Sequence, residues 1–110
     1  MIESFESKET EKIFLGQISK KLPLEIQRTA RRKLLYLDGA KDLQDLQAPQ
    51  GNKFEKLKGD RAGQISLDLI HPKRLLIVPD HEEEPRKPDG GLDWTKITRI
   101  MIIGVEDTHD

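Results

Sequence analysis

The spacing of apolar residues along this chain changes from a helical period to a strand-like one near residue 50. Between residues 23 and 38, apolar side chains return at steps of three or four residues, which places them on one face of a helix. After residue 52 the apolar runs are short and are bounded by Gly, Asp or Pro, as strands are. Helices followed by strands predict an α+β domain, with the helices packed on one face of an antiparallel sheet.

Two helices are expected in the first half of the chain. The first begins after Ser7, a residue that suits an N-cap, and ends at Gly16. The second and longer helix begins at Pro23, which suits a first turn, and ends at Gly39. A brief amphipathic turn then ends near Pro49.

The second half predicts four short strands, and residues 1–5 can add a strand at an edge of the sheet. In the run 65–70, apolar residues alternate with Ser66 and Asp68, so one face of that strand is buried and the other is polar. The run 97–105 is almost continuously apolar, as in a central strand covered on both faces. We therefore expect four to five strands, antiparallel and mixed at the edge, with the later ones at 53–57, 65–70, 74–78 and 97–105.

Length and composition narrow the class of protein. A chain of 110 residues forms one domain, here residues 1–110. It has no cysteine, which excludes a disulfide scaffold, a zinc finger and a thiol nucleophile, and fits a reducing compartment. No apolar run reaches the ~18 residues of a membrane span, and the acidic start does not resemble a signal peptide. We expect a cytoplasmic protein without membrane contact.

Charge is distributed unevenly along the chain, although the net charge is only -1. Residues 1–79 contain more Lys and Arg than Asp and Glu, whereas residues 80–110 are acidic. Most of that acidity lies in 80–93, a stretch with Pro and Gly that is expected to be a solvated loop. The remainder of the domain can therefore present a positive face, and the acidic loop at about 80–95 is interpreted as an insertion.

Several segments together resemble one protein family. They are the opening Met-Ile-x-Ser-Phe, the helical stretch 33–38 (KLLYLD), the Gly- and Lys-rich block 49–66 (PQGNKFEKLKGDRAGQIS), the strand that begins at Arg74 and the acidic close 106–109 (EDTH). The chain resembles the plasmid-maintenance killer proteins, the HigB branch of the RelE-like toxins of bacterial type II toxin–antitoxin systems. The central block is the most specific part of this resemblance.

The resemblance implies a RelE-like fold and a cytoplasmic toxin that enters the ribosomal A site and cuts mRNA there. It also implies a partner, a HigA-like antitoxin with a helix-turn-helix DNA-binding fold, which holds the toxin inactive. Operator DNA would be contacted only through that antitoxin. No cofactor or metal is expected, because the reaction uses the neighbouring 2′-hydroxyl of the RNA as nucleophile.

Metal-free RNA cleavage requires groups that neutralise the pentavalent phosphate and groups that move protons. For the scissile phosphate we choose Arg74, whose planar fork can bind two phosphate oxygens, and Lys58, a movable point charge. Lys53, Lys56 and Arg61 would contact the flanking RNA backbone, which adds affinity without sequence preference.

The proton-transfer candidates are Glu55 and His109. His109 stands where the family has a functional histidine, and an imidazole titrates near neutrality. Glu55 occupies a strand position where some relatives carry a histidine. The usual family ending is Asp-Tyr-His, but Thr108 replaces the tyrosine here. Because stacking on an aromatic ring contributes roughly 1 to 3 kcal/mol per base, the sequence predicts a weak or context-dependent nuclease.

Other interpretations of these residues remain open. Arg74 can be a cross-strand ion-pair partner of Asp68 or Glu106, and the lysines of 53–58 and the arginines of 28–32 can be solvated faces. Two further functions fit the same fold. One is a toxin that poisons DNA gyrase, and the other is a catalytically weakened relative that serves mainly as the antitoxin's partner and co-repressor.

Overall fold

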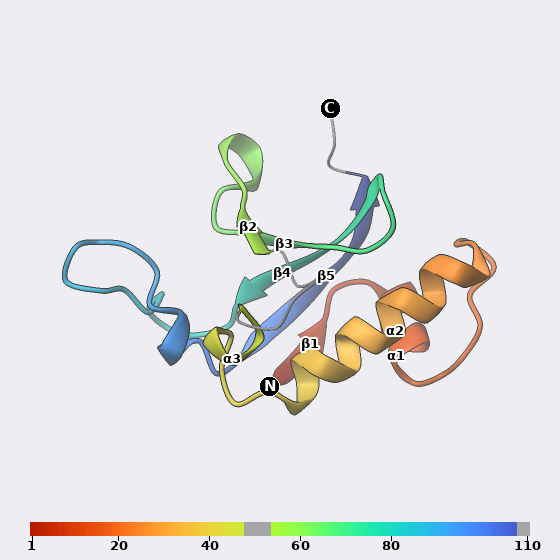
Figure 1. The fold of residues 1–110 in the computed structure, drawn as a ribbon, viewed down its shortest axis with the longest axis horizontal. Helices are drawn as coiled ribbons and strands as arrows, with labels where there is room; N and C mark the ends of the chain where they lie inside the picture. The colour runs from red at the N-terminus through yellow and green to blue at the C-terminus, as the bar shows by residue number, and fades with distance from the viewer. Residues whose placement is uncertain (48–53, 108–110) are drawn as a thin grey trace.

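A computed structural model describes residues 1–47 and 54–107. Figure 1 shows the sheet in the middle, the two main helices at one end and the segment between the last two strands projecting at the other. In chain order the elements are β1 (Ile2–Phe5), α1 (Lys8–Phe14), α2 (Leu24–Gly39), α3 (Gln44–Gln47), β2 (Phe54–Lys56), the 3₁₀ turn η1 (Gly59–Arg61), β3 (Ile65–Asp68), β4 (Lys73–Pro79), the 3₁₀ turn η2 (Trp94–Lys96) and β5 (Ile100–Asp107). This confirms the α+β class.

Five strands of the described residues form one sheet in the order β1-β5-β4-β3-β2. β1 runs parallel to β5, and the other pairs are antiparallel, so the sheet is mixed at one edge as predicted. β5 lies between β1 and β4, which confirms that it is an interior strand, but its residues alternate between buried and half-buried from Ile100 to Val105, so the predicted covering of both faces is not found. It begins at Ile100 and not at residue 97, because Asp93 caps η2 by accepting a hydrogen bond from the backbone of Thr95.

The helices begin and end close to their predicted residues. Ser7 caps α1 by accepting a hydrogen bond from the backbone N–H of Thr10 at 3.2 Å, and Gly16 follows the helix with φ of +84°. In α2 the buried side chains include two polar residues, Gln27 and Lys33. Gln27 donates to the carbonyl of Ser19 and accepts from its N–H. These hydrogen bonds of Gln27 stabilise the α1–α2 connection. None of the helices in the described ranges is long and apolar enough to cross a membrane.

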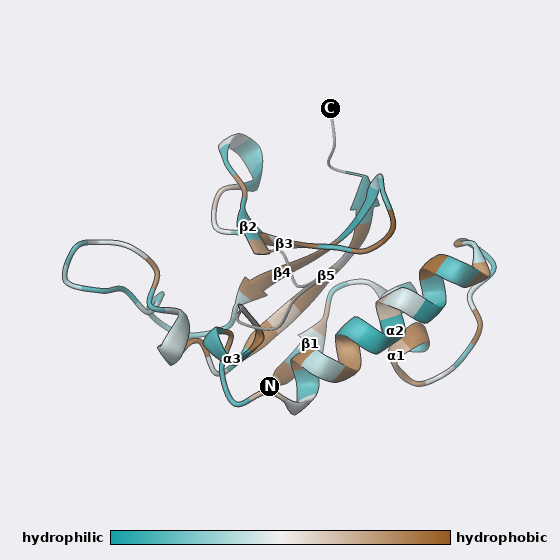
Figure 2. Cartoon of the chain, in the orientation of Figure 1, coloured by the Kyte–Doolittle hydropathy of each residue, from teal (hydrophilic) through white to brown (hydrophobic). Residues whose placement is uncertain are grey.

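The core lies between the helices and one face of the sheet. It combines Leu34 and Leu37 of α2 with the inward side chains of β3, β4 and β5. Figure 2 shows apolar stretches along β4 and β5 and at intervals along α2. The acidic segment after β4 is anchored to this core at its end, where Leu92 is buried. Trp94 packs against Phe54 of β2, with ring centroids 5.8 Å apart. The stretch 80–93 is therefore not solvated throughout.

Candidate functional site

A polar surface forms on the face of β2, β3, β4 and β5 that points away from the core. Residues that stand opposite each other in neighbouring strands project from the same face of a sheet. The register pairs Glu55 with Ser66, Asp68 with Arg74, and Arg74 with Glu106. Residues far apart in sequence are thereby placed side by side, and we call these five residues the Arg74 face.

Arg74 is the centre of this face and is held by side chains from two other strands. Its Nη1 donates to Oε2 of Glu55 at 2.7 Å and to the hydroxyl of Ser66, and its Nη2 lies 2.8 Å from Oδ1 of Asp68. The Arg74 side chain is 11% exposed, whereas that of Glu55 is 62% exposed. The ion pair with Asp68 was one of the alternatives left open by the sequence, and the structure contains it.

Arg61 reaches the same face from η1. Its Nη2 contacts Oε1 of Glu106, the residue that stands opposite Arg74 in β5. Both side chains of this pair are more than a third exposed. The contact joins the segment between β2 and β3 to the central strand, so the predicted phosphate ligands Arg61 and Arg74 lie on one surface.

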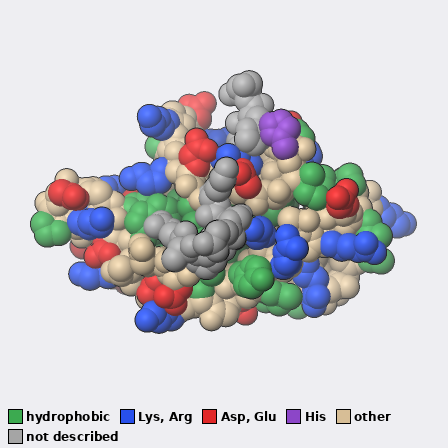
Figure 3. Space-filling view, viewed as in Figure 1, with side chains coloured by type: hydrophobic (Ala, Val, Ile, Leu, Met, Phe, Trp, Pro, Cys, Tyr) green, Lys and Arg blue, Asp and Glu red, His purple; other side chains and the backbone are tan. Residues whose placement is uncertain are grey.

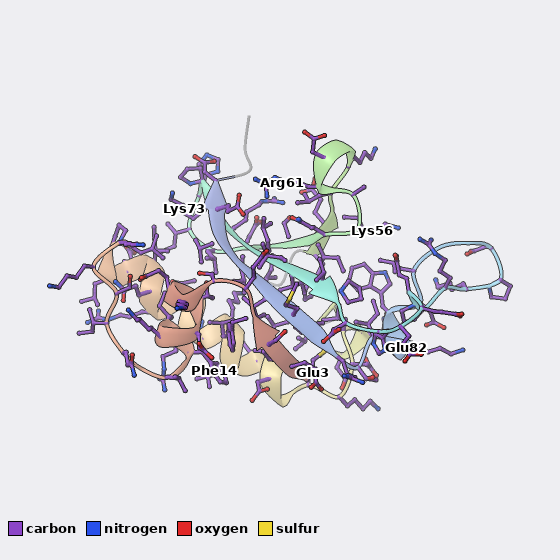
Figure 4. The ribbon with its side chains drawn as sticks, turned by 180° about the vertical axis from the view of Figure 1, so that it is seen from behind. Glu3, Phe14, Lys56, Arg61, Lys73 and Glu82 are labelled. Atoms are coloured by element: carbon purple, nitrogen blue, oxygen red, sulfur yellow. The ribbon has the colours of Figure 1, made fainter. Side chains whose placement is uncertain are left out.

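The predicted lysines are placed differently. Lys56 follows Glu55 in β2 and therefore projects from the other face, where it lines a hollow of about 150 Å³ together with Glu84, Arg86 and Leu92. Figure 4 shows Lys56 and Arg61 extending to opposite sides. Lys58 is exposed and directly precedes η1. Lys53 and His109, like Thr108, lie outside the described residues.

Two of the side chains that orient Arg74 were not among the predicted site residues. Asp68 was considered only as an alternative ion-pair partner of Arg74 and Ser66 only as part of the polar side of its strand, yet both bind the guanidinium. Lys33 of α2 was also overlooked; it stands on the buried stripe of the helix between Ala30 and Leu34. Burial, and next the charge of Arg32, lower the pKa of Lys33, while the nearby Asp68 opposes that shift. Its position among the apolar residues of a predicted helix was the sequence signal that could have identified Lys33.

This arrangement can bind a phosphate group, but only in competition with carboxylates. Guanidinium groups bind phosphate through the same N–H donors that now bind Glu55, Asp68 and Glu106. A phosphate that arrives at either guanidinium would therefore compete with these carboxylates. Displacement of Glu55 would at the same time free a carboxylate beside the bound phosphate, where it can accept a proton.

Comparisons with known proteins agree with this fold. The family model described as "RelE-like toxin of type II toxin-antitoxin system HigB" matches residues 3–81, well over half of the chain, and the match includes Glu55, Lys58, Arg61 and Arg74. Toxin HigB-1 of Vibrio cholerae is 38% identical over 56 residues, which are 51% of this chain and 59% of that toxin. The similarity to that relative thus spans little more than half of its length. The chain belongs to the HigB-like family of RelE-like toxins of type II toxin–antitoxin systems.

Proposed function

We propose that this chain is the toxin of a type II pair and that it cuts mRNA on the ribosome without a metal ion. The observation that carries the proposal is Arg74, a guanidinium held nearly buried on a polar sheet face by partners from β2 and β3. Such a side chain is oriented before the substrate arrives, as transition-state charge stabilisation requires. The family match supports the proposal, because the matched region contains this residue.

The proposed reaction begins when the scissile phosphate takes the place of Glu55 at Arg74. The 2′-hydroxyl oxygen attacks phosphorus, its proton passes to the released carboxylate of Glu55, and the bond to the 5′-oxygen breaks. His109 would protonate that leaving oxygen. Arg74 and Lys58 would neutralise the extra negative charge on the pentavalent phosphate, and the products would be a 2′,3′-cyclic phosphate and a 5′-hydroxyl.

The remaining roles concern binding. Arg61 would contact the flanking backbone from the end of η1, and Lys53 and Lys56 would add affinity elsewhere along the RNA without sequence preference. The ribosome would supply the mRNA in its A site. A helix-turn-helix antitoxin of the HigA type would hold the toxin inactive in the cytoplasm and carry the contact with operator DNA.

The test is induced expression of the wild-type chain and of the double variant Lys58→Ala, Arg74→Ala in the same host. We expect the wild type to arrest growth and fragment mRNA, and the variant to do neither while it still binds the antitoxin. Arg74→Ala leaves two carboxylates without their cation, which destabilises the fold. Lys58→Ala alone keeps those contacts, so a loss of cleavage in this single variant is not caused by unfolding. If the double variant arrests growth as the wild type does, the proposed site is wrong.

Two observations favour a second candidate function. Arg61 and Arg74 are both bound by carboxylates of the same chain, and Thr108 stands where relatives carry tyrosine. Both features weaken RNA binding, so a catalytically weakened partner and co-repressor of the antitoxin is the alternative. Under this alternative, expression of the wild-type chain leaves growth and mRNA intact, yet the chain strengthens operator binding by the antitoxin.

A further inference from the structure

The exposed large apolar side chains of the described residues gather in one region. All five of them lie between residues 15 and 36, in α2 and in the connection between α1 and α2: Leu15, Ile18, Leu24, Leu35 and Tyr36. Single exposed apolar residues are normal on a protein surface, but a cluster of them marks an interaction site. Ile18 is 76% exposed and Tyr36 is 55% exposed, so the folded chain alone covers little of either side chain.

Three arginines surround the apolar residues on the outer face of α2. Arg28, Arg31 and Arg32 recur with Leu35 and Tyr36 at steps of three and four residues, and the five line a groove of about 410 Å³. A smaller adjoining hollow of about 110 Å³ shares Arg28 and Arg31 and extends to Ile18 and Leu24. Figure 3 shows Lys and Arg side chains gathered over this part of the molecule. We call the groove formed by these five α2 residues the α2 groove.

These three arginines differ from the other four of the chain. Arg61, Arg74, Arg86 and Arg99 each lie within ion-pair distance of a carboxylate, the longest of these contacts being 3.4 Å between Arg99 and Glu3. Within the described ranges 1–47 and 54–107, no carboxylate lies within ion-pair distance of Arg28, Arg31 or Arg32. Three neighbouring positive charges on one helix face repel each other, and an anionic partner would relieve that repulsion.

We propose that the α2 groove binds a protein segment that places carboxylates around an apolar side chain, and that this segment belongs to the antitoxin. The proposal rests on the proposed function, because only a toxin has such a partner. The apolar component decides between protein and RNA. RNA could bind the arginines through its phosphates and stack a base on Tyr36, but it would leave Leu35 uncovered, whereas an acidic amphipathic segment covers all of these side chains.

None of the five residues of the α2 groove belongs to the Arg74 face, so substitutions can separate binding from cleavage. The groove is changed by Arg28→Glu with Arg32→Glu, which reverses its charge, and in a second variant by Tyr36→Ala. Glu is a good helix former and both arginines are exposed, so α2 is expected to form in each case. The matched control is Lys41→Glu with Lys87→Glu, which reverses two exposed charges elsewhere.

The experiment is a calorimetric titration of each full-length variant with the antitoxin protein encoded beside this chain. We expect the charge reversal to weaken binding about a hundredfold, Tyr36→Ala to weaken it about tenfold and the control to change it less than about threefold. Circular dichroism of each variant verifies the helix content. Unchanged affinity for the antitoxin in both groove variants would overturn the proposal.

Two further measurements exclude other occupants. If the groove variants bind the antitoxin normally but lose affinity for isolated ribosomes, the groove contacts RNA. If ultracentrifugation shows that the wild-type chain alone forms a dimer that the groove variants abolish, while antitoxin binding is unchanged, the groove is a self-association surface. Either result overturns the proposal. Should the wild type cut no mRNA while the groove variants still lose antitoxin binding, the docking surface stands and the nuclease function fails.

Discussion

Replacement of Asp68 by Asn tests whether carboxylates restrain Arg74. The substitution preserves the shape of the side chain but removes the charge of an oxygen that lies 2.8 Å from Nη2 of Arg74. Glu55 and Ser66 would continue to hold the other nitrogen of the guanidinium. The variant therefore weakens the restraint on Arg74 without abolishing it.

The size of the effect follows from the exposure of the pair. Fully exposed ion pairs contribute about 0.2 to 1 kcal/mol to folding, and breaking a buried pair costs about 3 to 5 kcal/mol. Asp68 is 38% exposed and Arg74 is 11% exposed, so solvent screens the pair in part, and we expect a loss of about 1 to 2 kcal/mol. If the phosphate that takes the place of Glu55 also binds Nη2 of Arg74 and displaces Asp68 there, removal of the Asp68 contact should strengthen RNA binding by about 5- to 30-fold.

The two readouts therefore move in opposite directions. Urea denaturation should show a lower free energy of unfolding for Asp68→Asn, while a ribosome-coupled cleavage assay below saturation should show faster cutting of mRNA. Asp60→Asn in η1 is the control, because it removes an equal charge from an exposed residue of the neighbouring segment. If both variants cut mRNA faster than the wild type, the higher cleavage rate results from the change in net charge alone. Slower cutting by Asp68→Asn than by the wild type would refute the reasoning.

Three other substitutions have expected outcomes. Gly104→Ala should lower the free energy of unfolding by about 1 to 3 kcal/mol, because φ is +152° and a Cβ would lie 3.2 Å from Cβ of Ser7. The hydrogen bond from Ser19 lowers the pKa of Glu9 below its ordinary value of 4.5; burial opposes that shift, and the charges of Lys12 and Lys21 add to it. That stabilisation is present above pH 4.5 and is lost as the pH falls, so the melting temperature of Ser19→Ala should depend less on pH between 5 and 3. Thr108→Tyr should cut mRNA about 5- to 100-fold faster, if the ring stacks on a base.

Each of these outcomes has a clear opposite. Unchanged unfolding of Gly104→Ala would mean that β5 relaxes around the added methyl group. Equal pH slopes for the wild type and Ser19→Ala would show that the hydrogen bond to Glu9 does not contribute to acid stability. Thr108→Tyr no faster than the wild type would remove the reason for expecting a weak nuclease.

Local signals sufficed for most of the fold. Ser7 marks a helix start by its side-chain hydroxyl, Gly16 and Pro23 mark helix ends by their backbone preferences, and short alternating runs mark strands, so the element order and the α+β class could be predicted. The role of the buried Gln27 could not be predicted. Its hydrogen bonds are made with backbone groups of the α1–α2 connection, and only the folded chain determines the path of that connection.

The site was less predictable than the fold for the same reason. Asp68 was proposed as a partner of Arg74, because a short turn between two strands brings nearby residues together. The contact of Arg74 with Glu55 needs the pairing of β2 with β3, and that of Arg61 with Glu106 joins residues 45 positions apart. No local pattern encodes such contacts. The projection of Lys56 away from the Arg74 face follows from strand alternation, once the strand has been placed.

The central claim is that this chain cuts mRNA through its Arg74 face by attack of the 2′-hydroxyl. The most direct measurement incubates the purified chain with ribosomes that hold an mRNA codon in the A site and determines the chemical ends of the fragments by mass spectrometry. The account predicts fragments with a 2′,3′-cyclic phosphate and a 5′-hydroxyl, formed by the wild type and at least about a hundredfold more slowly by Arg74→Gln. An intact mRNA, or fragments with a 5′-phosphate, would contradict it.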